Sequence, residues 1–182
     1  MSTEMVVRFC SPTLAGLKVA NMFSVRCRWR DEIMEHLAYY NNLLNEKGLY
    51  FKLLKYENEI ALIYVYRKQK LKEILQQKEV IKVLKSYGYD EMDMKTCLEK
   101  LMIHLEKKEF PHEIGIFLGY PIADVKAFIE HKGEGHKCVG CWKVYTNEQE
   151  AKATFCKFDK CTKIYYEKLL QGTEITRLTV VV

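Results

Sequence analysis

The chain has 182 residues, which is enough for one hydrophobic core of ordinary size but short for two full domains. Hydrophobic residues make up 48% and charged residues 29%, with nine glycines and three prolines, so fibrous, collagenous and disordered classes are excluded. The longest strongly apolar run, residues 60–66, is far shorter than the roughly 18 to 20 residues of a membrane helix. The first residues also lack the basic-then-apolar pattern of a signal peptide. We therefore expect a soluble, cytoplasmic protein with one domain over residues 1–182 and no membrane partner.

The net charge of +5 is too small to indicate nucleic-acid binding by itself, but it is unevenly distributed. In residues 1–30 a single acidic residue, Glu4, stands against five cations: Arg8, Lys18, Arg26, Arg28 and Arg30. The seven cysteines are an odd number and are scattered along the chain, so reduced thiols are expected rather than a disulfide scaffold.

The N-terminal third predicts a helix, a strand and a second helix. Ser11 followed by Pro12 is typical of a helix start, so a helix is expected from Pro12 to about Phe23. The segment 24–30 alternates apolar residues with arginines, which predicts a strand with one cationic face. Asp31 then resembles the cap of a helix that runs to Lys47 and ends at Gly48.

The rest of the chain predicts a mixture of both element types. Aromatic and β-branched residues with a break at Glu57-Asn58 predict a β-hairpin over 49–67. The remaining expected elements are helices over 68–86, 92–108 and 147–170, two short helices over 111–129, and strands near 141–145 and 174–181. The predicted class is α+β: a small, mainly antiparallel sheet (hairpin 49–67 plus short strands near 24–30, 141–145 and 174–181) packed with about six helices.

Several segments together resemble a bacterial domain-of-unknown-function family, DUF3793, which is met mainly in anaerobic Gram-positive bacteria. The resemblance rests on PHEIGIFLGYP at 111–121, on Trp142-Lys-Val-Tyr145, on 10–18, and on a C-terminal part with Lys160-Cys161, Gly172 and Arg177-Leu178. It covers nearly the whole chain and implies no reaction and no cofactor. The family pattern has an aromatic residue where this chain has Cys141, so the Cys138/Cys141 pair is peculiar to this member.

One hypothesis is an activated thiol. Cys10 directly precedes the predicted helix start, where free N–H groups and the helix dipole stabilise a thiolate. His112 and Glu113 stand in the first turn of another predicted helix. If the fold joins the two helix starts, Cys10 is the nucleophile, His112 the base and Glu113 its orienter. The alternative is that Cys10 is a small buried hydrophobe and that Glu113 only favours its helix N-terminus.

A second hypothesis is a pocket for a small anion. Arg26, Arg28 and Arg30, together with Lys18, can bind a phosphate or carboxylate, although a solvated strand face explains them equally. The pocket is expected from segments 10–18, 111–121 and 142–145. Its further candidate ligand-binding residues are Tyr120, Trp142, Lys143 and Tyr145, although such aromatic residues are commonly core.

Metal binding has only weak candidates, Cys138 and Cys141, which have the C-x-x-C spacing. Cys156 and Cys161 would complete a four-thiolate site, but five positions on a helix separate them by roughly 140°. We therefore assign no metal, and the cofactors remain unknown.

Three functions follow from these features. The first is a module that binds a small anionic ligand or a protein partner, the second is a thiol-dependent enzyme or redox protein using Cys10, and the third is a regulatory module using the helix pair at 111–129. Nucleic acid is disfavoured as a partner because the second helix of that pair offers few cations. Common nucleotide-binding and hydrolase glycine motifs are absent from the sequence, and whether the protein is an enzyme stays open.

Overall fold

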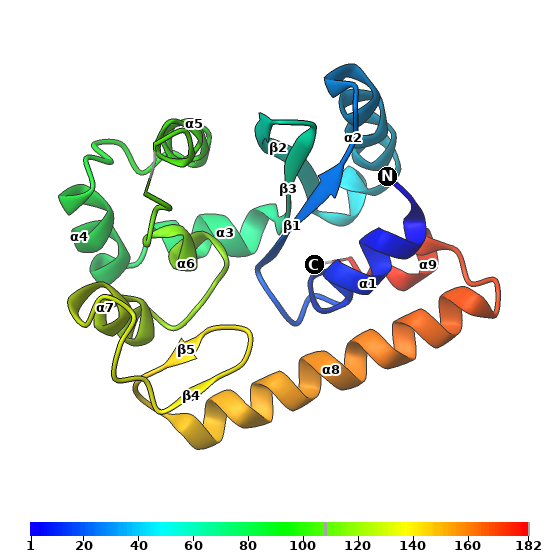
Figure 1. The fold of residues 1–182 in the computed structure, drawn as a ribbon. Coiled ribbons are helices and arrows are strands. Elements are labelled where there is room, and N and C mark those ends of the chain that lie inside the picture. The colour runs from blue at the N-terminus through cyan, green and yellow to red at the C-terminus, as the bar shows by residue number, and fades with distance from the viewer. Residues whose placement is uncertain (108, 182) are drawn as a thin grey trace. The chain divides into compact units, whose positions relative to one another are not determined.

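The computed structural model describes residues 1–107 and 109–181, and they form an α+β fold (Figure 1). They group into two compact units. Unit 1 comprises residues 1–70 and 160–182, and unit 2 comprises residues 71–159. The longest helix, α8 (Glu148–Leu170), contributes its first half to unit 2 and its second half to unit 1.

Unit 1 is a three-stranded antiparallel sheet with helices packed on it. The strands follow the order β1-β3-β2, so the tight hairpin β2–β3 is extended by β1 on the β3 side. The elements are α1 (Thr3–Leu14), β1 (Ala20–Arg26), α2 (Arg30–Leu44), the 3-10 helix η1 (Asn45–Lys47), β2 (Leu49–Glu57), β3 (Ile60–Arg67) and α9 (Ile175–Leu178).

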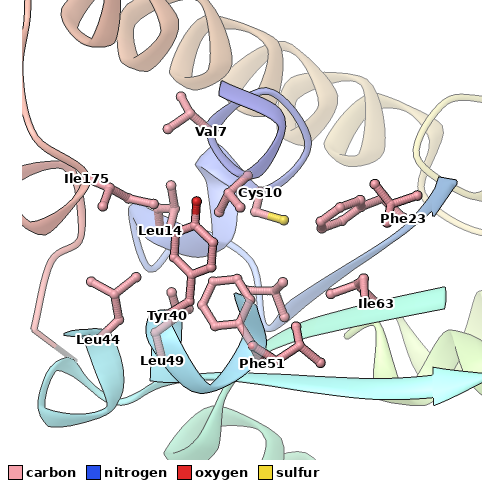
Figure 2. Close-up of a cluster of buried hydrophobic side chains, with 14 of the residues drawn as sticks. Val7, Cys10, Leu14, Phe23, Tyr40, Leu44, Leu49, Phe51, Ile63 and Ile175 are labelled. Atoms are coloured by element: carbon pink, nitrogen blue, oxygen red, sulfur yellow. The ribbon is translucent and has the colours of Figure 1, made fainter. Parts of the chain in front are cut away.

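The core of unit 1 lies between one face of this sheet and helices α1 and α2. Alternate residues of the strands point to that face, as the period of two requires, and they meet the apolar stripes of both helices. Figure 2 shows the cluster, in which Tyr40 of α2 stacks on Phe51 of β2 with ring centroids 5.2 Å apart. The thiol of Cys10 lies inside the same cluster, between Leu14 and Phe23.

A buried arginine joins three segments of unit 1. Arg67, at the end of β3, is only 1% exposed, and its guanidinium donates to four backbone carbonyls. These belong to Thr13 (2.7 Å) and Leu14 at the end of α1, to Lys47 (2.7 Å), and to Val180 (2.8 Å). Since the last carbonyls of a helix carry partial negative charge, the C-terminus of α1 is a favourable place for this cation. Arg67 thus connects α1, η1 and the C-terminal segment to the sheet.

Unit 2 consists mainly of short helices, with one two-stranded hairpin. Its elements are most of α3 (Lys68–Leu75), then α4 (Lys78–Ser86), α5 (Met94–Leu105), α6 (Ile114–Phe117), α7 (Ile122–Glu130), β4 (Cys138–Val139), β5 (Lys143–Val144) and the start of α8. On α4, Glu79 accepts from Lys126 of α7 at 3.3 Å, so these two helices lie side by side.

The hairpin over 49–67 and the long helix over 147–170 are confirmed. The hairpin turns at Asn58 and Glu59, which both adopt positive φ, as a two-residue turn matched to the strand twist requires. The two short helices beginning near Pro111 and Pro121 are also present, as α6 and α7. The described residues form nine α-helices rather than about six, partly because 68–86 breaks into α3 and α4.

The expected elements at the N-terminus are wrong in register. The helix begins at Thr3, with Ser2 accepting from the Met5 N–H, and Pro12 falls in its last turn instead of its first. One face of this helix, formed by Val6, Val7, Cys10 and Leu14, is buried. The free energy of this packing outweighs the preference of Pro12 for the first turn of a helix. The following strand therefore occupies 20–26, and the expected strand over 24–30 with a single cationic face does not form.

The expected strand at 174–181 is wrong as well. Residues 175–178 form the short helix α9, and the backbone of Val180 bonds to α1 and to Arg67. The β-branched composition favours a strand, but the backbone of this segment finds its partners at the end of α1 instead. The strand expected at 141–145 is shortened to β5, which pairs with β4 in a separate sheet. Among the described residues, the helices are all too short or too polar to cross a bilayer.

Replacing Arg67 tests its role in unit 1. Arg67→Met should lower the free energy of unfolding by more than about 3 kcal/mol, because several buried carbonyls lose a charged donor. Arg67→Lys should recover only part of this loss, since an ammonium cannot reach all four carbonyls. Urea denaturation followed by circular dichroism measures both.

Arg26→Met, which removes an exposed guanidinium 3.9 Å from Glu59, is the control and should change stability by less than about 0.5 kcal/mol. Equal effects of Arg67→Met and Arg26→Met would contradict this role.

Candidate functional site

A hollow in unit 2 is the strongest candidate site. Its volume is about 180 Å³, and its lining comes from residues 110–143. Its lining includes four aromatic side chains, Phe110, Tyr120, Phe128 and Trp142. Two of the three predicted pocket segments, 111–121 and 142–145, therefore contribute to it, whereas 10–18 belongs to unit 1.

Glycine at position 115 shapes the floor of the pocket. A Cβ there would lie 3.0 Å from Cγ2 of Val125 and 3.2 Å from the Tyr120 ring, so a larger residue would push α6 away from α7. The chain then turns through Gly119, whose φ of 73° is in the left-handed region. This turn presents Tyr120 to the pocket, directly before Pro121 starts α7.

Asp124 connects helix α7 to the β4–β5 hairpin. Its side chain is 3% exposed, and Oδ1 accepts from the backbone N–H groups of Tyr145 and Thr146, both at 2.9 Å, and from the Thr146 hydroxyl at 2.8 Å. Oδ2 accepts from Nε1 of Trp142 at 2.8 Å. Burial alone would raise the pKa of Asp124, but these hydrogen bonds, led by the one from Tyr145, outweigh it and hold that pKa below its usual range.

Trp142 is fixed by aromatic packing as well as by Asp124. Its ring meets Phe155 of α8 edge to face at 4.5 Å and lies 5.2 Å from the Tyr120 ring. The hairpin approaches α8 so closely that a Cβ on Gly140 would lie 2.3 Å from the Phe155 ring. Burial raises the pKa of Tyr120 to about 12, so its hydroxyl stays neutral near pH 7. The contacts with Asp124, Phe155 and Tyr120 together hold the indole of Trp142 in place at the pocket.

Two basic side chains lie at the pocket beside Phe128. The Lys143 ammonium donates to the Gly133 carbonyl at 2.8 Å and lies 5.7 Å from the Phe128 ring centroid. The His112 ring meets the same phenyl ring at 5.2 Å in a T-shaped contact. An ammonium has three N–H donors, and Gly133 takes one, so Lys143 can donate to a bound anion without leaving its place.

Tyr145 does not line this pocket. Its ring stacks on His131 at 5.8 Å, and burial is the main cause that raises its pKa. Its backbone N–H serves Asp124, so it supports the pocket from behind.

Glu113 takes part in a buried cluster that the sequence analysis missed. It is 0% exposed, and its Oε1 lies 2.6 Å from Nδ1 of His104 and accepts from the Tyr89 hydroxyl at 3.1 Å. Within the described part of the chain, Oε2 has no hydrogen-bond partner. Burial and the adjacent carboxylate raise the pKa of Tyr89. His104 lies three positions after Leu101, on the buried face of α5. This helical spacing is the one feature of the sequence from which the burial of His104 could have been predicted.

The structure removes the basis for an activated thiol at Cys10. This residue lies in the third turn of α1, not before a helix start, and its exposed fraction is 0%. Burial raises the pKa of the thiol far above its usual range, and the nearby Lys18 offsets this only in part. His112 and Glu113 are neighbours in unit 2 but point to different surroundings, since His112 is exposed and Glu113 is buried.

The three arginines do not form the expected row. Arg26 ends β1, Arg28 follows in the connecting loop with its guanidinium 5.0 Å from the Trp29 ring, and Arg30 begins α2. All three are exposed, whereas Lys18 is buried. The prediction of a cationic face required all three arginines to lie in one strand, but only Arg26 does.

The cysteine pair lies on the β4–β5 hairpin, with Cys138 half-buried and Cys141 exposed. On α8, Cys156 is exposed and Cys161 is buried, as their helical separation requires. Among residues 1–107 and 109–181, His, Cys, Asp and Glu side chains form no group of three or more suited to hold a metal ion.

Comparison with known families identifies the family of this chain. The family described as protein of unknown function (DUF3793) matches over residues 6–179, so the chain belongs to this family and the resemblance is confirmed. The match spans both units. Comparisons with curated proteins and with solved structures give no match.

Substituting Asp124 tests how the pocket is held together. In Asp124→Asn an amide donor faces the Trp142 N–H, and the expected loss at pH 7 is about 1.5–3 kcal/mol of unfolding free energy. Because the folded pKa is lowered, the carboxylate contributes fully above its unfolded pKa of about 4, and the contribution is lost as pH falls through the folded value. The two proteins should therefore converge in stability in acid.

Urea denaturation at pH 7 and below pH 4 measures this effect. Glu130→Gln, an exposed change on the same helix, is the control and should have little effect at either pH. A stability difference for Asp124→Asn that stayed constant with pH would refute the assignment.

The His104–Glu113 pair is tested by a double-mutant cycle. His104→Leu leaves the Glu113 carboxylate buried without its partner and should cost about 3–5 kcal/mol. Adding Glu113→Gln should restore part of this stability, because the amide carries no charge and still accepts from Tyr89. Thermal and urea unfolding measure the coupling, and strictly additive losses would show that the two side chains do not act as a pair.

Proposed function

We propose that this protein binds a small organic acid in the unit 2 pocket. The observation that carries the proposal is an apolar, aromatic-walled hollow that has the Lys143 ammonium at one side. Apolar pockets with a few convergent polar groups are the usual form of small-ligand sites.

The size of the pocket limits the ligand. An engineered cavity of about 150 Å³ accommodates benzene, so a hollow of about 180 Å³ accommodates one ring with a small substituent. Nucleotides and other multi-ring molecules are too large to enter completely. The aromatic rings of Trp142 and Phe128 in the lining favour a planar or apolar ring.

The charges around the pocket favour a carboxylate. Asp124 also reaches the lining, but its oxygens already accept from four donors, so its charge is compensated within the protein. Lys143 and His112 are then the groups that remain to contact a ligand. An anionic substituent gains more than a neutral one from an ammonium held in a partly desolvated position.

The other hypotheses receive less support from the structure. An enzyme that uses Cys10 would need a thiolate where burial opposes one. A regulatory role for the pair α6–α7 would have to use α6, which is four residues long, and Lys126, which is paired with Glu79. A protein partner at the Arg26, Arg28 and Arg30 surface has no geometric feature in its favour beyond charge and exposure.

We further propose that the protein acts in the cytoplasm of an anaerobic bacterium. The motif resemblance supports the bacterial source. The seven cysteines are present as thiols and not as disulfides, which is the usual state in a reducing compartment.

Calorimetric titration with benzoate, phenylacetate and the uncharged benzyl alcohol tests the proposal. The acids should bind more tightly than the alcohol, and Lys143→Met should weaken them about 10- to 100-fold while leaving the alcohol almost unchanged. Added salt should also weaken only the acids.

Lys137→Met is the matched control for Lys143→Met. Lys137 lies just before the same hairpin and also donates to a backbone carbonyl, that of Thr146 at 2.6 Å, but it does not line the pocket. The proposal fails if the acids bind no better than benzyl alcohol, or if both lysine variants weaken binding equally.

A further inference from the structure

The two edges of the unit 1 sheet differ. The strand order β1-β3-β2 leaves β1 and β2 at the edges. On β2, the Phe51 N–H donates to Oδ1 of Asn41 at 2.8 Å, and the Phe51 carbonyl accepts from Nδ2 of the same side chain at 2.9 Å. The register of β2 also shifts between Leu53 and Lys55, and such irregularities oppose further pairing. The edge of β2 is therefore closed to another strand.

The hydrogen bonds of β1 all run toward β3. Just before β1, the Val19 carbonyl accepts from the Arg67 N–H at 2.9 Å, and just after it the Cys27 N–H donates to the Glu59 carbonyl at 2.8 Å. The antiparallel register between these two points is unbroken. Because alternate residues of an antiparallel strand bond to the same neighbour, the odd-numbered residues of β1 face β3.

The even-numbered residues of β1 leave an open edge. Met22, Ser24 and Arg26 point their backbone N–H and carbonyl groups away from β3, and no residue that the structure describes bonds to these groups. Ser24 and Arg26 are exposed, and Met22 is half-buried. A row of unpaired N–H and carbonyl groups is a template for one more strand.

Side chains beside this edge define what an added strand must carry. On the core face, such a strand would lie next to Phe23 (Figure 2). Phe9 of α1 stacks on the Phe23 ring at 5.2 Å and is 43% exposed, so apolar surface is available there. On the opposite face the neighbours are Ser24 and Arg26. Since side chains alternate between the faces of a strand, the segment that fits alternates apolar and polar residues.

The charge beside the edge selects the polar residues. Residues 18–30 include four cations and no acidic residue. The Arg26 side chain is 82% exposed, and the Arg28 guanidinium lies 5.0 Å over the exposed Trp29 ring. A surface of arginine side chains alone has no geometric feature that selects a partner, but the open backbone edge beside Arg26 supplies one. A second copy of β1 would bring another cationic strand without a carboxylate.

We propose that the open edge of β1 is a docking site for an extended acidic segment of a partner protein, in which apolar residues alternate with carboxylates. The segment adds a fourth strand to the sheet of unit 1 and pairs with the backbone of Met22, Ser24 and Arg26. Its apolar side chains lie beside Phe23, and its carboxylates lie beside Arg26. The pocket of unit 2 takes no part, so the inference is independent of the proposed function.

Fluorescence anisotropy with labelled synthetic peptides tests the docking on the full chain. The probe alternates glutamate with valine, and the matched peptide carries lysine in place of glutamate. The glutamate peptide should bind saturably, and the lysine peptide should bind at least about 10-fold more weakly. Added salt should weaken the glutamate peptide. Methylation of alternate peptide nitrogens of the probe, which removes the hydrogen-bond donors of one edge, should abolish binding.

Two variants of β1 separate backbone pairing from charge. Ser24→Pro removes an outward N–H, which an edge strand tolerates, and should weaken the glutamate peptide at least about 10-fold. Ser24→Val keeps that N–H and is the matched control, with an expected change of less than about twofold. Arg26→Glu should weaken the glutamate peptide and strengthen the lysine peptide. It keeps the backbone of β1 intact, so it remains informative if Ser24→Pro does not fold, which circular dichroism reports.

Sedimentation at increasing protein concentration tests the alternative occupant. The chain should remain a single species without the peptide. Self-association that Ser24→Pro abolishes would show that a second copy occupies the edge, and it would overturn the inference. The inference is also overturned if the glutamate peptide does not bind, if both peptides bind equally, or if Ser24→Val weakens binding as much as Ser24→Pro.

Discussion

The carboxylate of Asp124 is the interaction on which the pocket of unit 2 depends. One helical residue accepts four hydrogen bonds from the β4–β5 hairpin and the two residues after it, and so binds a two-stranded ribbon that is too short to be stable alone. A charged acceptor makes stronger hydrogen bonds than a neutral one, and burial protects them from competition with water. The position of Trp142, and therefore the shape of the pocket, follows from this single carboxylate.

Unit 1 uses a buried charge of the opposite sign in the same way. Arg67 satisfies carbonyls at the end of α1, at the end of η1 and in the C-terminal segment, where helical hydrogen bonding has ended. Arg67 donates only to backbone carbonyls, and Asp124 accepts from two backbone N–H groups and two neutral side-chain donors, so these hydrogen bonds involve no countercharge. Such an arrangement fixes direction as well as distance, because backbone groups cannot rearrange without disturbing their own elements.

The proposed ligand site depends on a short piece of the β4–β5 hairpin. Gly140 lies against Phe155, Cys141 is exposed, and Trp142 and Lys143 both line the pocket, so these four consecutive residues have three different environments. The buried cluster around Glu113 is next in sequence to His112 and Ile114, which also line the pocket.

The sequence by itself determined the elements with a strong local period, because side-chain alternation and helical stripes are encoded within a few residues. The hairpin at 49–67 and the stripe of α2 are of this kind. Only the tertiary structure decided the partners of single polar residues. Glu113 meets His104, Arg67 meets Val180, and Cys10 is buried in a helix that lies about nine residues closer to the N-terminus than expected. These pairings join residues of different elements, so no local sequence pattern indicates them. Burial, which also depends on the tertiary structure, determines whether a polar side chain or a thiol is reactive or structural.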